Sequence, residues 1–111
     1  MTDRELLELA AKAINLPERG WMGPAFMYVK DNTFTDWNPL TDDGDALRLA
    51  VKLDLIVSRG CTEVGKEAVV FYLNEIQHQM RCVVPHGNNP YAATRLAIVR
   101  AAAEIGKAKC E

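Results

Sequence analysis

The segment that begins at Asp45 most constrains what this chain can fold into. Read as a helix, residues 45–53 carry apolar side chains on nearly every side, and only Asp45, Arg48 and Lys52 form a narrow polar stripe. The apolar members are Ala46, Leu47, Leu49, Ala50, Val51 and Leu53. A helix that is apolar on most sides is stable in water only if most sides are covered. We therefore expect this helix to be buried on most sides, against a sheet.

Two helices begin at residues suited to capping a helix N-terminus. Thr2 predicts the start of a helix over residues 2–16. Pro17 ends this helix, because the residue before a proline avoids helical backbone angles. Thr41 or Asp42 caps the helix described above.

A third helix closes the chain. Asn89 is a good N-cap, and the ring of Pro90 suits the first helical position. Gly106 is a typical C-terminal stop. We expect residues 105–111 to form a frayed tail.

Four further segments have the composition or the alternation of β-strands. They are residues 25–30, 55–59, 68–74 and 78–84. The last three follow one another closely and predict an antiparallel meander. The whole chain, residues 1–111, then forms one α+β domain in the order α-β-α-β-β-β-α. We expect a small, mainly antiparallel sheet of three to four strands with helices packed on both faces.

Composition argues against several classes of function. Lys plus Arg number 13 and Asp plus Glu number 15, so the net charge of −2 gives no long-range attraction to nucleic acid or to an anionic membrane. No stretch approaches the ~20 apolar residues of a membrane span, and the first residues do not resemble a signal peptide. The chain has an odd number of cysteines, Cys61, Cys82 and Cys110, which is typical of reduced thiols in a cytoplasm.

The acids around Gly44 raise the question of a metal loop. Asp42, Asp43 and Asp45 precede an apolar run, as acids at a helix start do. A calcium loop with Gly44 at its sixth position needs a glutamate at its twelfth, where this chain has Ala50. We interpret the acids as serving the helix start, with metal or substrate binding as the open alternative.

Zinc-binding residue types also occur, four residues apart, at His78, Cys82 and His86. On a strand, positions four apart lie about 13 Å from one another, too far for one shared ion. No motif marks a catalytic residue, a metal or a cofactor, so we predict none and expect a protein that is not an enzyme. A hydrolase or metal enzyme using Cys82, His78 or the Asp42–Asp45 cluster is the weaker alternative.

Five of the eight aromatic residues lie within residues 21–37. Trp21 and Trp37 fall in turn-rich segments, where exposed aromatics commonly anchor a partner. The competing interpretation is that they close the edge of a small core. The candidate binding residues are Trp21, Phe34, Trp37, Asp42 and Asp43.

Two blocks of the chain resemble the phage ABA-sandwich domain family of small phage and prophage proteins. The first block carries Pro39, Thr41, Asp42, Ala46, Ala50, Val51, Lys52 and Leu53, and the last helix carries Ala93, Thr94, Ala97, Ile98, Arg100, Ala101 and Ala102. The resemblance spans residues 36–106. It implies layers of helix, sheet and helix, and expression in the cytoplasm of a bacterial host. It implies no catalytic residue.

These observations favour a small, non-enzymatic, phage-encoded accessory protein. Its expected partner is a host or phage protein, or a second copy of itself, because a short sheet leaves edges that another strand can pair with. The alternative is a small-ligand protein that binds a nucleotide-like molecule between Trp21 and Trp37. Neither hypothesis involves nucleic acid or a membrane.

Overall fold

The computed structural model describes residues 1–109 and folds into three helices and two antiparallel sheets. The helices are α1 (Asp3–Ala13), α2 (Asp43–Lys52) and α3 (Pro90–Ala108). The first sheet consists of β1 (Gly20–Met22), β2 (Ala25–Lys30) and β3 (Thr33–Asp36), and the second of β4 (Ile56–Thr62), β5 (Gly65–Leu73) and β6 (Gln79–Pro85). The α+β class and the predicted order are confirmed, with β2 as the expected first strand.

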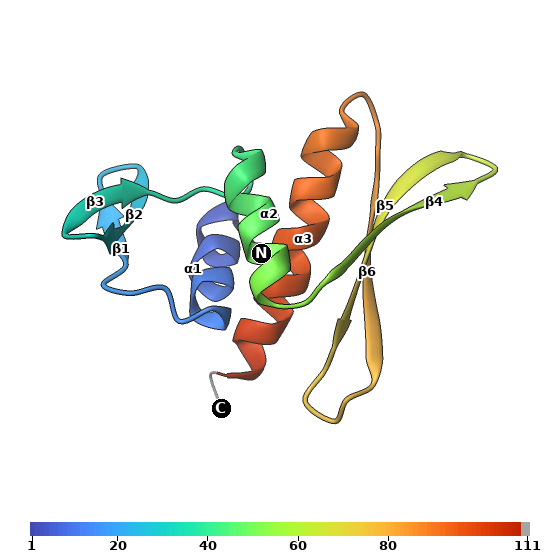
Figure 1. Cartoon of the computed structure of the whole chain (residues 1–111). Coiled ribbons are helices and arrows are strands. Elements are labelled where there is room, and N and C mark those ends of the chain that lie inside the picture. Colours follow the sequence, from blue (N-terminus) through green and yellow to red (C-terminus); the bar gives the residue numbers. More distant parts are fainter. Residues whose placement is uncertain (110–111) are drawn as a thin grey trace.

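The layers differ from the expected single sheet with helices on both faces. Figure 1 shows the helices between the two sheets, with β1–β3 on one side and β4–β6 on the other. The extra sheet arises because Asp31 and Asn32 both adopt positive φ, at 51° and 63°. A two-residue turn of this kind matches the twist of a hairpin, and short polar side chains tolerate it. This turn joins β2 to β3, whereas β1 pairs with β2 across a separate turn at Gly23, which also has a positive φ. Both β1 and β3 lie in segments for which the sequence predicts irregular structure.

All three helix starts are capped as predicted. The side chains of Thr2, Asp42 and Asn89 accept from the backbone N–H groups of Glu5, Asp45 and Ala92, at 3.2, 2.8 and 3.1 Å. The first helix is shorter than residues 2–16, however. It ends at Ala13, and Asn15 turns the chain with a φ of 51° before Pro17 is reached.

Helix α3 is the centre of the molecule. It packs on α1, on α2 and on β5 and β6. Its C-terminal end is not the predicted frayed tail, because the helix runs through Gly106 to Ala108. Lys109 then donates to the carbonyl of Ala13 at 2.8 Å. The rest of that prediction, residues 110–111, lies outside the described residues.

Helix α2 differs from the prediction that it is buried on most sides against a sheet. It packs on α3 rather than on a sheet. Ala46, Leu49 and Ala50 are buried in the core, whereas Leu47 and Val51 remain exposed. One neighbouring helix covers only one side of a helix that is apolar nearly all round. No helix within residues 1–109 combines the length and the apolar character needed to cross a membrane.

Candidate functional site

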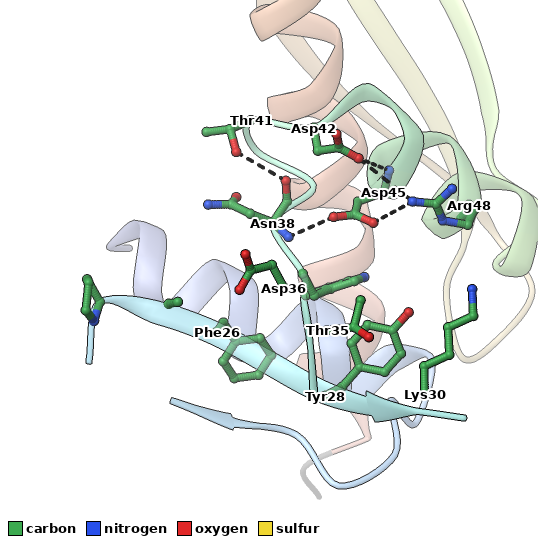
Figure 2. A pocket seen from close by; sticks show the side chains of 13 residues that line it. Phe26, Tyr28, Lys30, Thr35, Asp36, Asn38, Thr41, Asp42, Asp45 and Arg48 are labelled. Carbon is green, nitrogen blue, oxygen red and sulfur yellow. Dashed lines mark hydrogen bonds and ion pairs between the residues drawn. The ribbon is translucent and has the colours of Figure 1, made fainter. Parts of the chain in front are cut away.

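A hollow of about 600 Å³ lies between the first sheet and the start of α2. Figure 2 shows its two walls: Tyr28 and Lys30 extend from β2 toward α2, and Arg48 extends from α2. Its lining brings together two of the candidate binding residues, Trp37 and Asp42. Trp21, Phe34 and Asp43 do not line it. The five candidate binding residues therefore do not form one site.

The acids at the start of α2 contact protein groups. Asp45 is only 8 % exposed, and its carboxylate accepts from the backbone N–H of Asn38 at 3.0 Å and from Arg48 at 2.7 Å. Asp42 caps the helix. Asp43 pairs with Arg95 of α3 at 2.6 Å. The three carboxylates stabilise the helix start and its connections, which agrees with the capping interpretation.

The two tryptophans close the edge of the core. Trp37 is 4 % exposed, and its ring lies 5.9 Å from the ring of Phe26. Trp21 donates its indole N–H to Glu8 of α1 at 2.7 Å, and the guanidinium of Arg4 lies 4.1 Å from the ring centroid. The Trp37 ring therefore offers a ligand almost no exposed surface on which to stack. Phe34, on β3, is exposed and separate from this cluster.

Three polar side chains at the hollow form no hydrogen bond or ion pair within residues 1–109, although Tyr28 interacts electrostatically with Arg48. They are the hydroxyl of Tyr28, the ammonium of Lys30 and the carboxylate of Asp36. A donor, a cation and an anion at one opening suit a small polar molecule with groups of both charges. Because Lys30 and Asp36 are exposed, water solvates them well without a ligand.

A second, apolar hollow of about 270 Å³ lies where α2, α3 and β4 meet. Ala46, Ala50 and Ile98 line its inner part. We call the exposed apolar side chains here the docking surface: Leu47, Val57 and Tyr91, which line the hollow, and Val51, one turn after Leu47 on α2. Leu47, Val51 and Tyr91 are 63 %, 68 % and 70 % exposed.

The surroundings of the residues considered for nucleophilic or metal chemistry do not favour either kind of chemistry. Burial raises the pKa of the Cys82 thiol, and Glu104 raises it further, although Arg100 acts in the opposite direction. A raised pKa leaves less of the nucleophilic thiolate at neutral pH. Among residues 1–109, no three His, Cys, Asp or Glu side chains are grouped so as to hold a metal ion.

Comparison of the chain with models of protein families, with curated proteins and with solved structures finds no match. The resemblance to the phage family therefore stays a prediction.

Sequence analysis did not identify the docking surface. The sequence signal for it is the apolar character of residues 45–53, which equally predicts burial within the chain. The exposed positions Leu47 and Val51 are four apart and lie on one side of α2. Which side of such a helix remains open depends on where α3 packs.

Proposed function

We propose that this protein is a small, non-enzymatic binding module that docks another protein on the docking surface. The observation that carries the proposal is the exposure of Leu47 and Tyr91 at one apolar hollow, together with the exposed Val51 one turn after Leu47 on α2. These side chains and Val57 leave on the order of 400 Å² of surface in water, as large as the main apolar patch of a typical monomer. Patches of that size are often functional.

The energetics favour a protein partner. Burying one exposed Leu or Val completely contributes about 1.5–3 kcal/mol, so four such side chains supply several kcal/mol toward association. Tyr91 is the kind of residue that dominates interfaces, since its ring adds area and its hydroxyl can stay at the wet rim. The ion pair between Asp43 and Arg95 borders the hollow, which gives the apolar centre a polar edge.

Site-specific photo-crosslinking in a bacterial cytoplasm tests the proposal. A benzophenone side chain is placed at Val51, on the docking surface, or at Ile76, in the β5–β6 turn. Both positions are 68 % exposed, so they form a matched pair. We expect discrete crosslinked species from position 51 and none from position 76. Equal crosslinking at both positions, or none at either, contradicts the proposal.

A phage or prophage origin and a host or phage partner belong to the same proposal, supported by the resemblance of residues 36–106. The identity of the species crosslinked at position 51 distinguishes a host protein, a phage protein and a second copy of the chain.

A small polar ligand in the hollow beside Trp37 is the second candidate. The polar groups of Tyr28, Lys30 and Asp36, which form no hydrogen bond within residues 1–109, favour it. Base stacking between Trp21 and Trp37 does not, because Trp37 is buried and Arg4 lies over Trp21. Titration of the common nucleotides and amino acids, followed by tryptophan fluorescence, tests this candidate. A saturable signal that Tyr28→Phe weakens supports it, and no signal from any of them contradicts it.

A further inference from the structure

We infer that the docking surface is covered by a second copy of this chain, with β4 of each copy paired to β4 of the other. This inference rests on the proposed function and names its partner. The two copies then share one continuous six-stranded antiparallel sheet.

Strand β4 is open for such pairing. It borders only β5, so the backbone groups along its other side have no strand partner within residues 1–109. Natural edge strands are commonly protected by charge, proline or short length. β4 runs for seven residues without proline, and Arg59 is its only charged residue. β6, at the opposite edge, ends in Pro85.

The symmetry of the pairing brings the two docking surfaces together. Two identical neighbouring strands that run antiparallel are related by a two-fold axis perpendicular to the sheet. That axis keeps the helices of both copies on the same face. Val57 lies on this face, because it pairs with Val70, which is buried in the core, and because it lines the hollow with Leu47 and Tyr91. Each surface then meets its equivalent, as closed dimers require.

Charge excludes one register of the two strands. A pairing centred on Arg59 would place two arginines directly opposite each other, and like charges in that position are destabilising. A pairing centred on Val57 avoids this contact. It sets Val57 against its own equivalent, beside the Leu47 and Val51 side of α2.

The area available is consistent with a stable dimer. A standard interface buries roughly 800 Å² on each partner. The docking surface supplies about half of that amount, and the newly paired strand, with its exposed Ile56, lies next to it. The net charge of −2 per copy opposes association only weakly.

Sedimentation equilibrium of the full chain, between about 1 μM and about 1 mM, tests the inference. We expect twice the monomer mass at the upper end. Val51→Lys should weaken association more than about tenfold, because it buries a charge at the interface. The matched variant Ile76→Lys should remain dimeric. If circular dichroism shows that Val51→Lys does not fold, Leu47→Lys replaces it, since that side chain is also exposed.

Amide hydrogen exchange distinguishes this pairing from other dimers. We expect the outward-facing amides of β4 to exchange more slowly at high concentration, and those at the open edge of β6 to stay unchanged. A monomer at every concentration overturns the inference, and so does a dimer that Val51→Lys leaves intact or whose β4 amides gain no protection. Crosslinking from position 51 to a different protein would then still support the proposed function. If the chain neither forms this dimer nor crosslinks from position 51, both the inference and the proposed function are wrong.

Discussion

The backbone of Gly106 in α3 lies directly against the main-chain carbonyl of Leu9 in α1. A Cβ atom at Gly106 would overlap that carbonyl, and it would also lie 3.3 Å from the backbone nitrogen of Ala13. The close approach of the two helices therefore requires glycine at this position. It also explains why a residue that usually ends helices lies inside one here.

Gly106→Ala should destabilise the fold. In an isolated helix this substitution would contribute roughly 1 kcal/mol of stability. Here the added methyl group meets backbone, which cannot move aside cheaply, so we expect a net loss of about 1–3 kcal/mol or more in the free energy of unfolding. Urea unfolding measures it. The control is Gly44→Ala in α2, where only side-chain atoms of Arg48 and Asp42 lie near, at 3.2 Å. Equal effects of the two substitutions would contradict the helix contact.

Asp45→Ala should cost more stability than Asp43→Ala. Asp45 is buried and accepts from the backbone N–H of Asn38, so its removal leaves a donor without a partner, at a cost of about 1–3 kcal/mol. Asp43 is exposed in its ion pair with Arg95, an arrangement worth about 0–1 kcal/mol. Urea unfolding of both variants makes the comparison. The reverse order would mean that the connection to Asn38 does not hold α2 in place.

Trp37→Ala should be far more destabilising than Trp21→Ala. Trp37 is buried against Phe26, and emptying such a site typically costs about 3–5 kcal/mol. Trp21 is only half-buried, so we expect a smaller loss. The second readout is acrylamide quenching of the single-tryptophan variants Trp21→Phe and Trp37→Phe. Emission from Trp37 should be the better protected. Equal quenching would contradict the role of Trp37 as a core residue.

Cys82 should react more slowly than Cys61 with iodoacetamide at neutral pH. Burial and Glu104 raise the pKa of the Cys82 thiol, so less thiolate is present to react, whereas Cys61 is exposed. Mass spectrometry of each single-cysteine variant, in a Cys110→Ser background, gives the two rates. We expect at least a tenfold difference in native protein and none in urea. Equal native rates would contradict the burial of Cys82.

Stability should fall at alkaline pH. Burial raises the pKa of both the Cys82 thiol and the Tyr72 phenol in the folded state. Unfolding lets these groups lose their protons more readily, so the stability present at neutral pH is lost as pH rises above the ordinary thiol value of about 8.5 and through the raised folded values. Urea unfolding between pH 7 and 10 measures this loss. Cys82→Ala should reduce the loss, and Cys61→Ser should not. If Cys82→Ala loses as much stability between pH 7 and 10 as the unchanged protein does, other groups cause the loss.

Several features could be predicted from sequence because short-range chemistry determines them. The three helix caps depend on side chains that reach backbone N–H groups three residues away, and all three formed as expected. Strands β4, β5 and β6 follow one another with short turns, so their antiparallel pairing could also be predicted from the sequence.

Features that depend on distant contacts could not be predicted. Gly106 is a helix stop by local preference, yet its helix continues because α1 packs against it. Trp21 and Trp37 could be an open site or a core edge, and only the positions of Glu8, Arg4 and Phe26 decide between them.

The sequence by itself determined the α+β class, the order of the predicted elements and the apolar character of the second helix on most of its sides. Local backbone preference and side-chain periodicity are enough for these conclusions. Only the tertiary structure decided that α3 packs on α2 and leaves Leu47 and Val51 in solvent, with Leu47 at the same hollow as Val57 of β4. The physical reason is that the hydrophobic effect is non-directional: any apolar surface that removes the helix from water stabilises it. The apolar pattern of a sequence therefore indicates that a helix favours burial. Only the packing of the elements determines whether the covering surface belongs to the same chain or to another one.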